Sequence, residues 1–194
     1  MITFMFKDVI AVTNRKLVKG DYLEQIRKVV SKQPYGLILR EKDLSDEEYE
    51  TLSAKVLKIC AESGTLCFLH SRYQIAEKLG CRNIHLSLGS FIENRENIRH
   101  FERISVSCHS LSDVKKALDY GATQIVLGTI FETECKKGQK GKGVDFLKEI
   151  TGYCRANGGI PVFAIGGITP EKLNEVKSAG ARGGCMMSYM MNKI

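Results

Sequence analysis

The repeated order of strand and helix patterns constrains the fold of this chain more than any other feature of its sequence. Short β-rich runs alternate with helical periodicities along almost all of its 194 residues. Several of these runs are apolar at successive positions, as parallel strands covered on both faces are. The predicted strands are residues 9–13, 35–40, 66–70, 83–86, 104–108, 124–128, 161–167 and 183–187.

Eight strand–helix units predict one domain over residues 1–194, a small (β/α)₈ TIM barrel of the α/β class. An open doubly wound sheet is the main alternative, because periodicity does not show closure. Helix-start signals agree with the helical segments. Capping-box spacing occurs at Ser45 and Ser110, and Thr169 stands before a first-turn proline.

The end of the chain predicts a truncated last helix. After the eighth strand only SYMMNKI remains, which is too short for a full closing helix. We therefore expect a second copy of the chain to cover the exposed apolar wall, as a homodimer or a higher homo-oligomer. Met190 and Met191 fit this expectation, although a terminal helix packed on its own barrel has the same pattern.

Composition excludes several classes of protein. No apolar run approaches the roughly 18 residues of a membrane span. The apolar start MITFMF lacks the basic leader and the cleavage site of a signal peptide. The seven cysteines are odd in number and contain no CxxC pair, which argues against a zinc site or a disulfide framework. These features predict a cytoplasmic protein with no membrane contact.

The net charge of +7 favours anionic partners. The basic residues are spread along predicted helices apart from one loop, and no nucleic-acid-binding motif accompanies them. We therefore expect a small anionic molecule, and not a nucleic acid, as the ligand.

Candidate site residues are those at the carboxyl ends of the predicted strands, where the active sites of TIM barrels form. The clearest ligand signal is AIGGITPEKL, in which Gly166 and Gly167 separate a strand from a helix. Backbone N–H groups in such a turn can bind a phosphate, with Ser188 after the eighth strand contributing to the same site. The alternative is a tight turn that needs glycine only for its shape.

Two basic segments lie at the same strand ends. FETECKKGQKGKGV is a lysine-rich loop that can close over an anionic ligand or simply be solvated. In LREKDLS, Arg40 and Lys42 can hold a phosphate or carboxylate or be ordinary rim charges. Of the histidines, His109 stands where a strand ends and a helix begins, whereas His85 fits a core or rim position and His100 the surface.

These motifs in this order resemble the thiamine phosphate synthase/TenI superfamily, and its TenI-type thiazole tautomerase branch most closely. The resemblance covers nearly the whole chain. LREKDL and AIGGITPE are similar to both branches, whereas HSLSD and FETECKKGQKGKGV look like the tautomerase. The segments that carry it are AVTNR, LREKDLS, SVSCHSL, LGTIFETECKKG, FAIGGITPEKL and AGARGG.

The chain departs from the synthase where that enzyme binds magnesium and a pyrimidine pyrophosphate. The synthase has an Asn-Asp pair after its third strand and an Asp after its fourth. Here the corresponding segments read LHSR and HLSLGSF. Because magnesium prefers carboxylate oxygens, we expect no metal and no cofactor in this chain.

The resemblance implies an isomerase of thiamine biosynthesis that aromatises a carboxythiazole phosphate tautomer. His109 matches the catalytic histidine of the family, and an imidazole can serve as base and then as acid near neutral pH. Arg40 and Lys42 match anion-binding positions, and Lys136 is expected to meet the substrate carboxylate or phosphate. Which of Ser107 and Cys108 faces the site stays open. The residues implied to hold the phosphate are Gly166, Gly167, Ile168, Met187 and Ser188.

Two alternatives remain. One is thiamine phosphate synthase itself, a transferase that joins thiazole phosphate to the pyrimidine pyrophosphate. The other is a non-catalytic regulatory protein that binds thiazole or thiamine phosphate.

Overall fold

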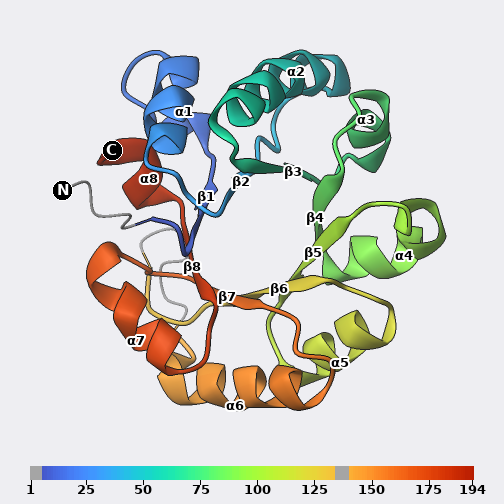
Figure 1. Ribbon diagram of the computed structural model, residues 1–194, viewed down its shortest axis with the longest axis vertical. Helices are drawn as coiled ribbons and strands as arrows, with labels where there is room; N and C mark the ends of the chain where they lie inside the picture. The colour runs from blue at the N-terminus through green and yellow to red at the C-terminus, as the bar shows by residue number, and fades with distance from the viewer. Residues whose placement is uncertain (1–5, 134–139) are drawn as a thin grey trace. The chain divides into compact units, whose positions relative to one another are not determined.

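The strands of this chain form a parallel, closed eight-stranded barrel in the order β1 to β8, as a computed structural model of residues 6–133 and 140–194 shows. This arrangement, labelled in Figure 1, confirms the predicted TIM-barrel fold and rules out the open sheet. The strands are β1 (Val9–Val12), β2 (Gly36–Leu39), β3 (Leu66–His70), β4 (Asn83–Ser87), β5 (Arg103–Cys108), β6 (Gln124–Gly128), β7 (Val162–Ile165) and β8 (Gly183–Met186).

The helices follow the strands as the periodicity predicted. Two short 3₁₀ helices, η1 (Arg15–Leu17) and η3 (Pro170–Lys172), precede α1 and α7. The α-helices are α1 (Tyr22–Ser31), α2 (Asp46–Ser63), α3 (Tyr73–Lys78), α4 (Leu88–Ile98), α5 (Leu111–Asp119), α6 (Gly143–Ala156), α7 (Leu173–Ser178) and α8 (Ser188–Asn192). None of these helices is long and apolar enough to cross a membrane.

The predicted helix starts are largely as the sequence indicated. Ser45 forms a complete capping box with Glu48, and the Ser110 hydroxyl accepts a hydrogen bond from the N–H of Asp113. Thr169 precedes Pro170 as expected, but it makes no side-chain capping bond to the 3₁₀ helix that begins there. A local pattern therefore located these starts even where the capping contact itself is absent.

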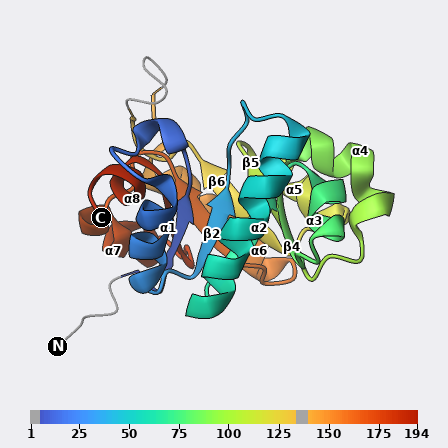
Figure 2. The same ribbon diagram turned by 90° about the horizontal axis from the view of Figure 1, so that it is seen from above.

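The chain divides into two compact units, one formed by the chain up to His85 with Met187–Ile194 and the other by Leu86–Met186. In the first unit α1 and α2 lie side by side, as Figure 2 shows, and α8 packs on α1 and η1. Met190 and Met191 are buried there, and Gln25 Nε2 donates to the Met190 carbonyl at 2.8 Å. The methionines thus pack within their own chain, and the homo-oligomer stays a prediction without their support.

In the second unit α5, α6 and α7 are successive neighbours outside the strands (Figure 1). The strand β6 is buried along its whole length, and Gln124 Nε2 donates to Ser105 Oγ at 3.0 Å within that core. The buried polar groups of this strand pair are thereby satisfied. The six cysteines outside residues 134–139 are buried free thiols.

Tyr49 joins the carboxyl ends of two strands in the first unit. Its hydroxyl donates to the Leu39 carbonyl at 2.7 Å and accepts from the His70 N–H at 2.9 Å. The side chain is fully buried, so Tyr49→Phe leaves two backbone groups unsatisfied and is expected to lower the free energy of unfolding by about 2 kcal/mol. Urea denaturation measures this. Tyr120→Phe, at an exposed tyrosine, is the control. Equal urea midpoints for the two variants would show that the Tyr49 hydroxyl does not stabilise the contact between the two strands.

Candidate active site

His109 is held at the carboxyl end of β5 by contacts to its backbone and its ring. Its N–H donates to Asp113 Oδ2 at 2.7 Å, and its carbonyl accepts a hydrogen bond from Lys142 Nζ. Its Nδ1 lies 2.6 Å from the carbonyl oxygen of Gly128 at the end of β6. No described residue hydrogen-bonds to Nε2, and the side chain is exposed.

The Gly128 contact determines which ring nitrogen of His109 is basic. A carbonyl oxygen can only accept a hydrogen bond, so Nδ1 must carry the proton. In the neutral imidazole the lone pair then resides on Nε2. His109 is therefore arranged as a base at Nε2, and it becomes a donor at the same atom once it is protonated.

The glycine turn after β7 packs against the segment that follows β6. Gly166 and Gly167 have φ values of +101° and +61°, in the region that favours glycine. A Cβ on Gly166 would lie 2.4 Å from Thr129 Cγ2, and one on Gly167 would lie 2.5 Å from the Glu132 carbonyl oxygen. Both glycines are thus required by conformation and by close approach.

Hydrogen bonds leave part of this turn available to a ligand. Ile130 N–H donates to the Ile165 carbonyl at 2.9 Å, and Phe131 N–H donates to the Gly166 carbonyl at 3.0 Å. In the part of the chain that the structure describes, no acceptor is bound by the N–H groups of Gly167 and Ile168. These two donors suit a phosphate oxygen.

The segment after β6 connects the histidine to the glycine turn. Gly128 accepts from the His109 ring, and the residues directly after it contact Gly166 and Gly167. A Cβ on Gly128 would lie 2.4 Å from Ile165 Cγ2, so glycine allows β6 and β7 to approach here. The peptide bond between Gly128 and Thr129 is cis. The structure therefore gathers His109, Gly166 and Gly167 around one segment of the second unit.

Lys142 is a residue of this site whose role sequence reasoning missed. Its N–H donates to the Thr129 carbonyl at 2.9 Å, and its Nζ donates to the His109 carbonyl. It lies directly before α6, and the sequence carries no signal that separates it from the other lysines of the loop. Lys136, which was assigned to the substrate, and Cys135 lie outside the described residues.

Arg40 and Lys42 follow β2 in the first unit. Arg40 is half-buried and Lys42 is exposed, and neither forms an ion pair with another described residue. The adjacent acid is already paired, because Asp43 binds Lys16 at 2.9 Å and Arg15 at 2.7 Å. Hydrogen bonds from these two cations hold the pKa of Asp43 well below its usual range. Arg40 and Lys42 therefore have no acidic partner within residues 6–133 and 140–194.

Two imidazoles lie side by side on β3 and β4: His70 ends β3, and His85 is the middle residue of β4. His70 and His85 are register partners with ring centroids 5.7 Å apart, and Ser71 Oγ lies 2.9 Å from His70 Nδ1. Burial lowers the pKa of His70 to about 4 and that of His85 to about 3, and the charge of Arg40 adds to both effects. Both histidines are therefore neutral near pH 7, and His85 is buried as predicted.

This donor set does not fit magnesium. After β3, where the resemblance places part of the magnesium site of the synthase, the chain presents His70 and Ser71. The ring of His85 lies beside His70, and the charges of Arg40 and Lys42 act on His70. Magnesium requires hard oxygen donors. Burial, with the charge of Arg40, lowers the pKa of both histidines, and the same surroundings disfavour a bound cation. Within residues 6–133 and 140–194, no three His, Cys, Asp or Glu side chains are grouped so that they can hold a metal ion.

The remaining predicted residues take the following places. Met187 follows β8 and Ser188 begins α8, so both belong to the first unit, and their role in phosphate binding stays a prediction. Cys108 is fully buried close to Cys154 of α6, so it faces the helices, and by strand alternation Ser107 faces the barrel interior. Burial raises the pKa of Cys108 to about 12, which leaves it an unreactive thiol.

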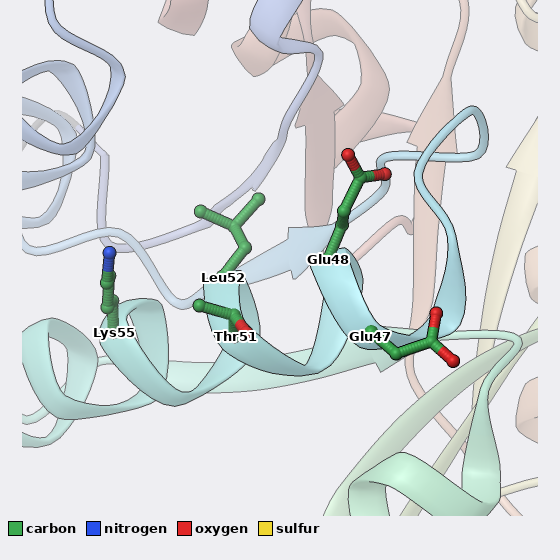
Figure 3. A pocket seen from close by; sticks show the side chains of 5 residues that line it. All are labelled: Glu47, Glu48, Thr51, Leu52 and Lys55. Carbon is green, nitrogen blue, oxygen red and sulfur yellow. The ribbon is translucent and has the colours of Figure 1, made fainter.

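Two cavities lie away from these residues. One, of about 380 Å³, is lined only by side chains of α2, which Figure 3 shows: Glu47, Glu48, Thr51, Leu52 and Lys55. The other, of about 240 Å³, lies before β7 and β8, at the opposite ends of those strands from the glycine turn, and Arg155 and Arg182 are among the residues that line it. Neither contains a residue predicted from the sequence.

A closed parallel barrel with polar groups at the carboxyl ends of its strands is the architecture of TIM-barrel enzymes. Within that class, the sequence profile of one family, TMP-TENI (thiamine monophosphate synthase), matches residues 9–190. The chain belongs to this family.

Several relatives span nearly the whole chain. The putative thiamine-phosphate synthase 2 of Aquifex aeolicus is 33% identical over 176 residues, which cover 89% of this chain and 91% of that protein. The thiamine-phosphate synthase of Fusobacterium nucleatum is 29% identical over 185 residues, 94% of this chain and 88% of that protein. The structure of thiamine phosphate pyrophosphorylase from Pyrococcus furiosus, 21% identical, matches with a TM-score of 0.80 over 99% of this chain and 90% of that one, and it shows the shared fold.

These comparisons confirm the superfamily and its connection with thiamine biosynthesis. The relatives carry the name of a transferase, so they favour the alternative given above, the synthase, over the isomerase. They do not single out the tautomerase branch. The choice between the two reactions therefore depends on the chemistry of the site.

Proposed function

We propose that this chain is an isomerase that aromatises a carboxythiazole phosphate tautomer, with His109 as the group that moves the proton. The observation that carries this proposal is the contact between His109 Nδ1 and the Gly128 carbonyl oxygen. This contact fixes an exposed imidazole with its lone pair on Nε2. A positioned group that can take up and return a proton is what general acid–base catalysis requires.

The reaction balances with one histidine. Nε2 removes the proton from C2 of the thiazole ring, and the bonding electrons enter the ring as it becomes aromatic. The resulting imidazolium returns a proton to the exocyclic carbon, so no electrons or atoms are gained or lost. The Gly128 carbonyl accepts from Nδ1 throughout, which stabilises the charged ring while it carries the proton.

The glycine turn is the proposed phosphate site. The N–H groups of Gly167 and Ile168, which bind no acceptor among the described residues, support it, and Gly166 sets the shape of the turn. Met187, Ser188 and Lys136 are proposed contributors by resemblance. Holding the phosphate fixes the ring relative to Nε2, which is the main advantage an enzyme has over the spontaneous reaction.

The transferase is the second candidate, because the relatives are named as synthases and because Arg40 and Lys42 have charge to offer a pyrophosphate. Against it stands the poor fit of His70, Ser71 and His85 to magnesium. A metal is the usual means of stabilising a departing pyrophosphate.

One paired assay separates these candidates. The tautomer, freshly generated by thiazole synthase, is mixed with the protein without magnesium, and aromatisation is followed by ultraviolet absorbance. A parallel reaction supplies aromatic thiazole phosphate, the pyrimidine pyrophosphate and magnesium, and thiamine phosphate is measured. Acceleration in the first reaction supports the isomerase. Product in the second alone replaces it with the transferase, and tight ligand binding without either product indicates the regulatory protein.

Gly167→Ala tests the phosphate site. Its Cβ would lie 2.5 Å from the Glu132 carbonyl oxygen, and its φ of +61° strains any side chain, so the turn must shift. Because a displacement of about 1 Å moves both N–H donors, we expect the Kd for thiazole phosphate to rise at least about tenfold. Calorimetry measures this. Gly152→Ala, in α6 with open space around it, is the matched control, and an unchanged Kd in Gly167→Ala would show that the phosphate binds elsewhere.

A further inference from the structure

We infer that Glu41 is a positioning residue for the anion-binding segment after β2: its buried carboxylate ties the loop after β1 to that segment and so places Arg40 and Lys42. This inference rests on the proposed role of Arg40 and Lys42 in anion binding, and it goes beyond the proposed function by assigning a role to Glu41. It concerns only residues of the first unit.

The carboxylate of Glu41 is buried and saturated with donors. Only 2% of the residue is exposed. Oε1 accepts from Thr13 Oγ1 at 2.7 Å and from the Tyr22 hydroxyl at 3.1 Å. Both oxygens accept from the Arg15 N–H at 3.1 Å, and Arg15 Nη1 lies 3.4 Å from Oε2. A buried carboxylate that accepts this many hydrogen bonds holds the surrounding groups in place, which a solvated charge at the rim of the barrel does not do.

The same network reaches the backbone of Arg40. Thr13 Oγ1 donates to Glu41 and accepts from the Arg40 N–H at 2.9 Å. The Thr13 N–H donates to the Ile38 carbonyl at 3.0 Å, so the ends of β1 and β2 are joined twice. Arg40 and Lys42 are the residues on either side of Glu41. Fixing the carboxylate therefore fixes the backbone from which both cations extend.

The charges around Glu41 are distributed so that the two cations stay unpaired. Arg15 contacts both Glu41 and Asp43, and Lys16 also binds Asp43. The acids of this segment are thus neutralised from the loop after β1. Burial and the nearby carboxylate raise the pKa of Tyr22 far above its usual value, so its hydroxyl stays a neutral donor to Glu41. Arg40 and Lys42 remain available to an anion.

A carboxylate suits this position because every contact described above donates to it, and the Arg15 N–H and guanidinium have no accepting atom. Glutamine has the same size, but its amide nitrogen would face the N–H of Arg15, the hydroxyl of Thr13 or that of Tyr22. Glu41→Gln therefore keeps the volume of the side chain and removes one of its accepting atoms. We expect this change to release the loop after β1 while leaving the barrel folded.

The test measures binding of inorganic pyrophosphate by calorimetry on the full chain, with Glu62→Gln at an exposed position of α2 as the control. The Kd of Glu41→Gln is expected to rise about tenfold. In an Arg40→Ala, Lys42→Ala background, Glu41→Gln is expected to change the Kd less than about twofold, because the groups it places are gone. Where the isomerase is active, KM rises with Glu41→Gln while kcat stays within about twofold.

Three results would overturn the inference. They are a wild type that does not bind pyrophosphate, a Glu41→Gln variant that binds like the wild type, and an equal effect of Glu41→Gln with and without Arg40 and Lys42. Loss of thermal stability with unchanged binding makes Glu41 merely structural, which also overturns it. Binding of pyrophosphate is measured without turnover. A negative tautomerase assay would therefore contradict the proposed reaction but would not decide the role of Glu41.

Discussion

Replacing His109 with alanine is expected to lower kcat for aromatisation of the thiazole tautomer by about 10³-fold, within the range that general acid–base groups contribute. The Kd for thiazole phosphate should change less than about twofold, because the N–H groups of Gly167 and Ile168 belong to another segment. The reason is specific to one atom. His109 Nδ1 is bound to the Gly128 carbonyl, so Nε2 is the base, and alanine removes it.

The control for this change is His100→Ala, which removes an exposed histidine that lies between α4 and the start of β5, and not at the carboxyl end of a strand. Initial rates from ultraviolet absorbance give kcat and KM for both variants, with the spontaneous reaction subtracted. His109→Gln is a useful second variant, since its amide cannot serve as a base near pH 7. Retention of more than about one tenth of the wild-type kcat in both His109 variants would show that the histidine is only structural.

The second large effect is a loss of stability in mild acid. The pKa values of His70 and His85 are lowered to about 4 and about 3 by burial, against 6.5 for an ordinary histidine. Between pH 6.5 and these lowered pKa values, the unfolded chain binds more protons than the folded chain. The free energy of unfolding therefore falls as the pH falls. The contribution is fully present above pH 6.5 and is lost progressively below it. We expect the free energy of unfolding to be about 5 kcal/mol lower at pH 4.5 than at pH 7.5, with each histidine contributing about half.

Urea denaturation at the two pH values measures this difference. Hydrogen bonds from Lys16 and Arg15 lower the pKa of Asp43 well below its usual range, so this carboxylate does not titrate in the window. His70→Asn removes one of the two titrating groups, so it should remove roughly half of the pH dependence. His100→Ala should leave the dependence intact, because that side chain is exposed. A wild-type stability that is flat from pH 7.5 to 4.5 would contradict the buried neutral pair.

Elements with local signals were predicted from the sequence with few errors. Apolar runs located all eight strands to within about two residues at each end, and the Ser45 and Ser110 caps lie where the spacing placed them. The truncated last helix is present as α8. The expectation that Met190 and Met191 need a partner subunit lost its support, because their burial depends on α1 and η1, which are distant in sequence.

The candidate site was predictable in its residue types but not in its contacts. His109 and the glycine pair stand at strand ends, so the fold alone selects them. The roles of Lys142 and Glu41 were missed because each is defined by its partners. One lysine in a basic loop resembles another, and a glutamate between Arg40 and Lys42 resembles any charged residue at a strand end.

The sequence by itself determined the number and order of the strands, their parallel arrangement and the family, because periodicity, caps and motifs are properties of neighbouring residues. Only the tertiary structure decided which nitrogen of His109 is basic and that Glu41 is a buried acceptor. The first depends on a carbonyl 19 residues away and the second on a hydroxyl 28 residues away. Such contacts form when the ends of different strands meet, and no local pattern encodes them.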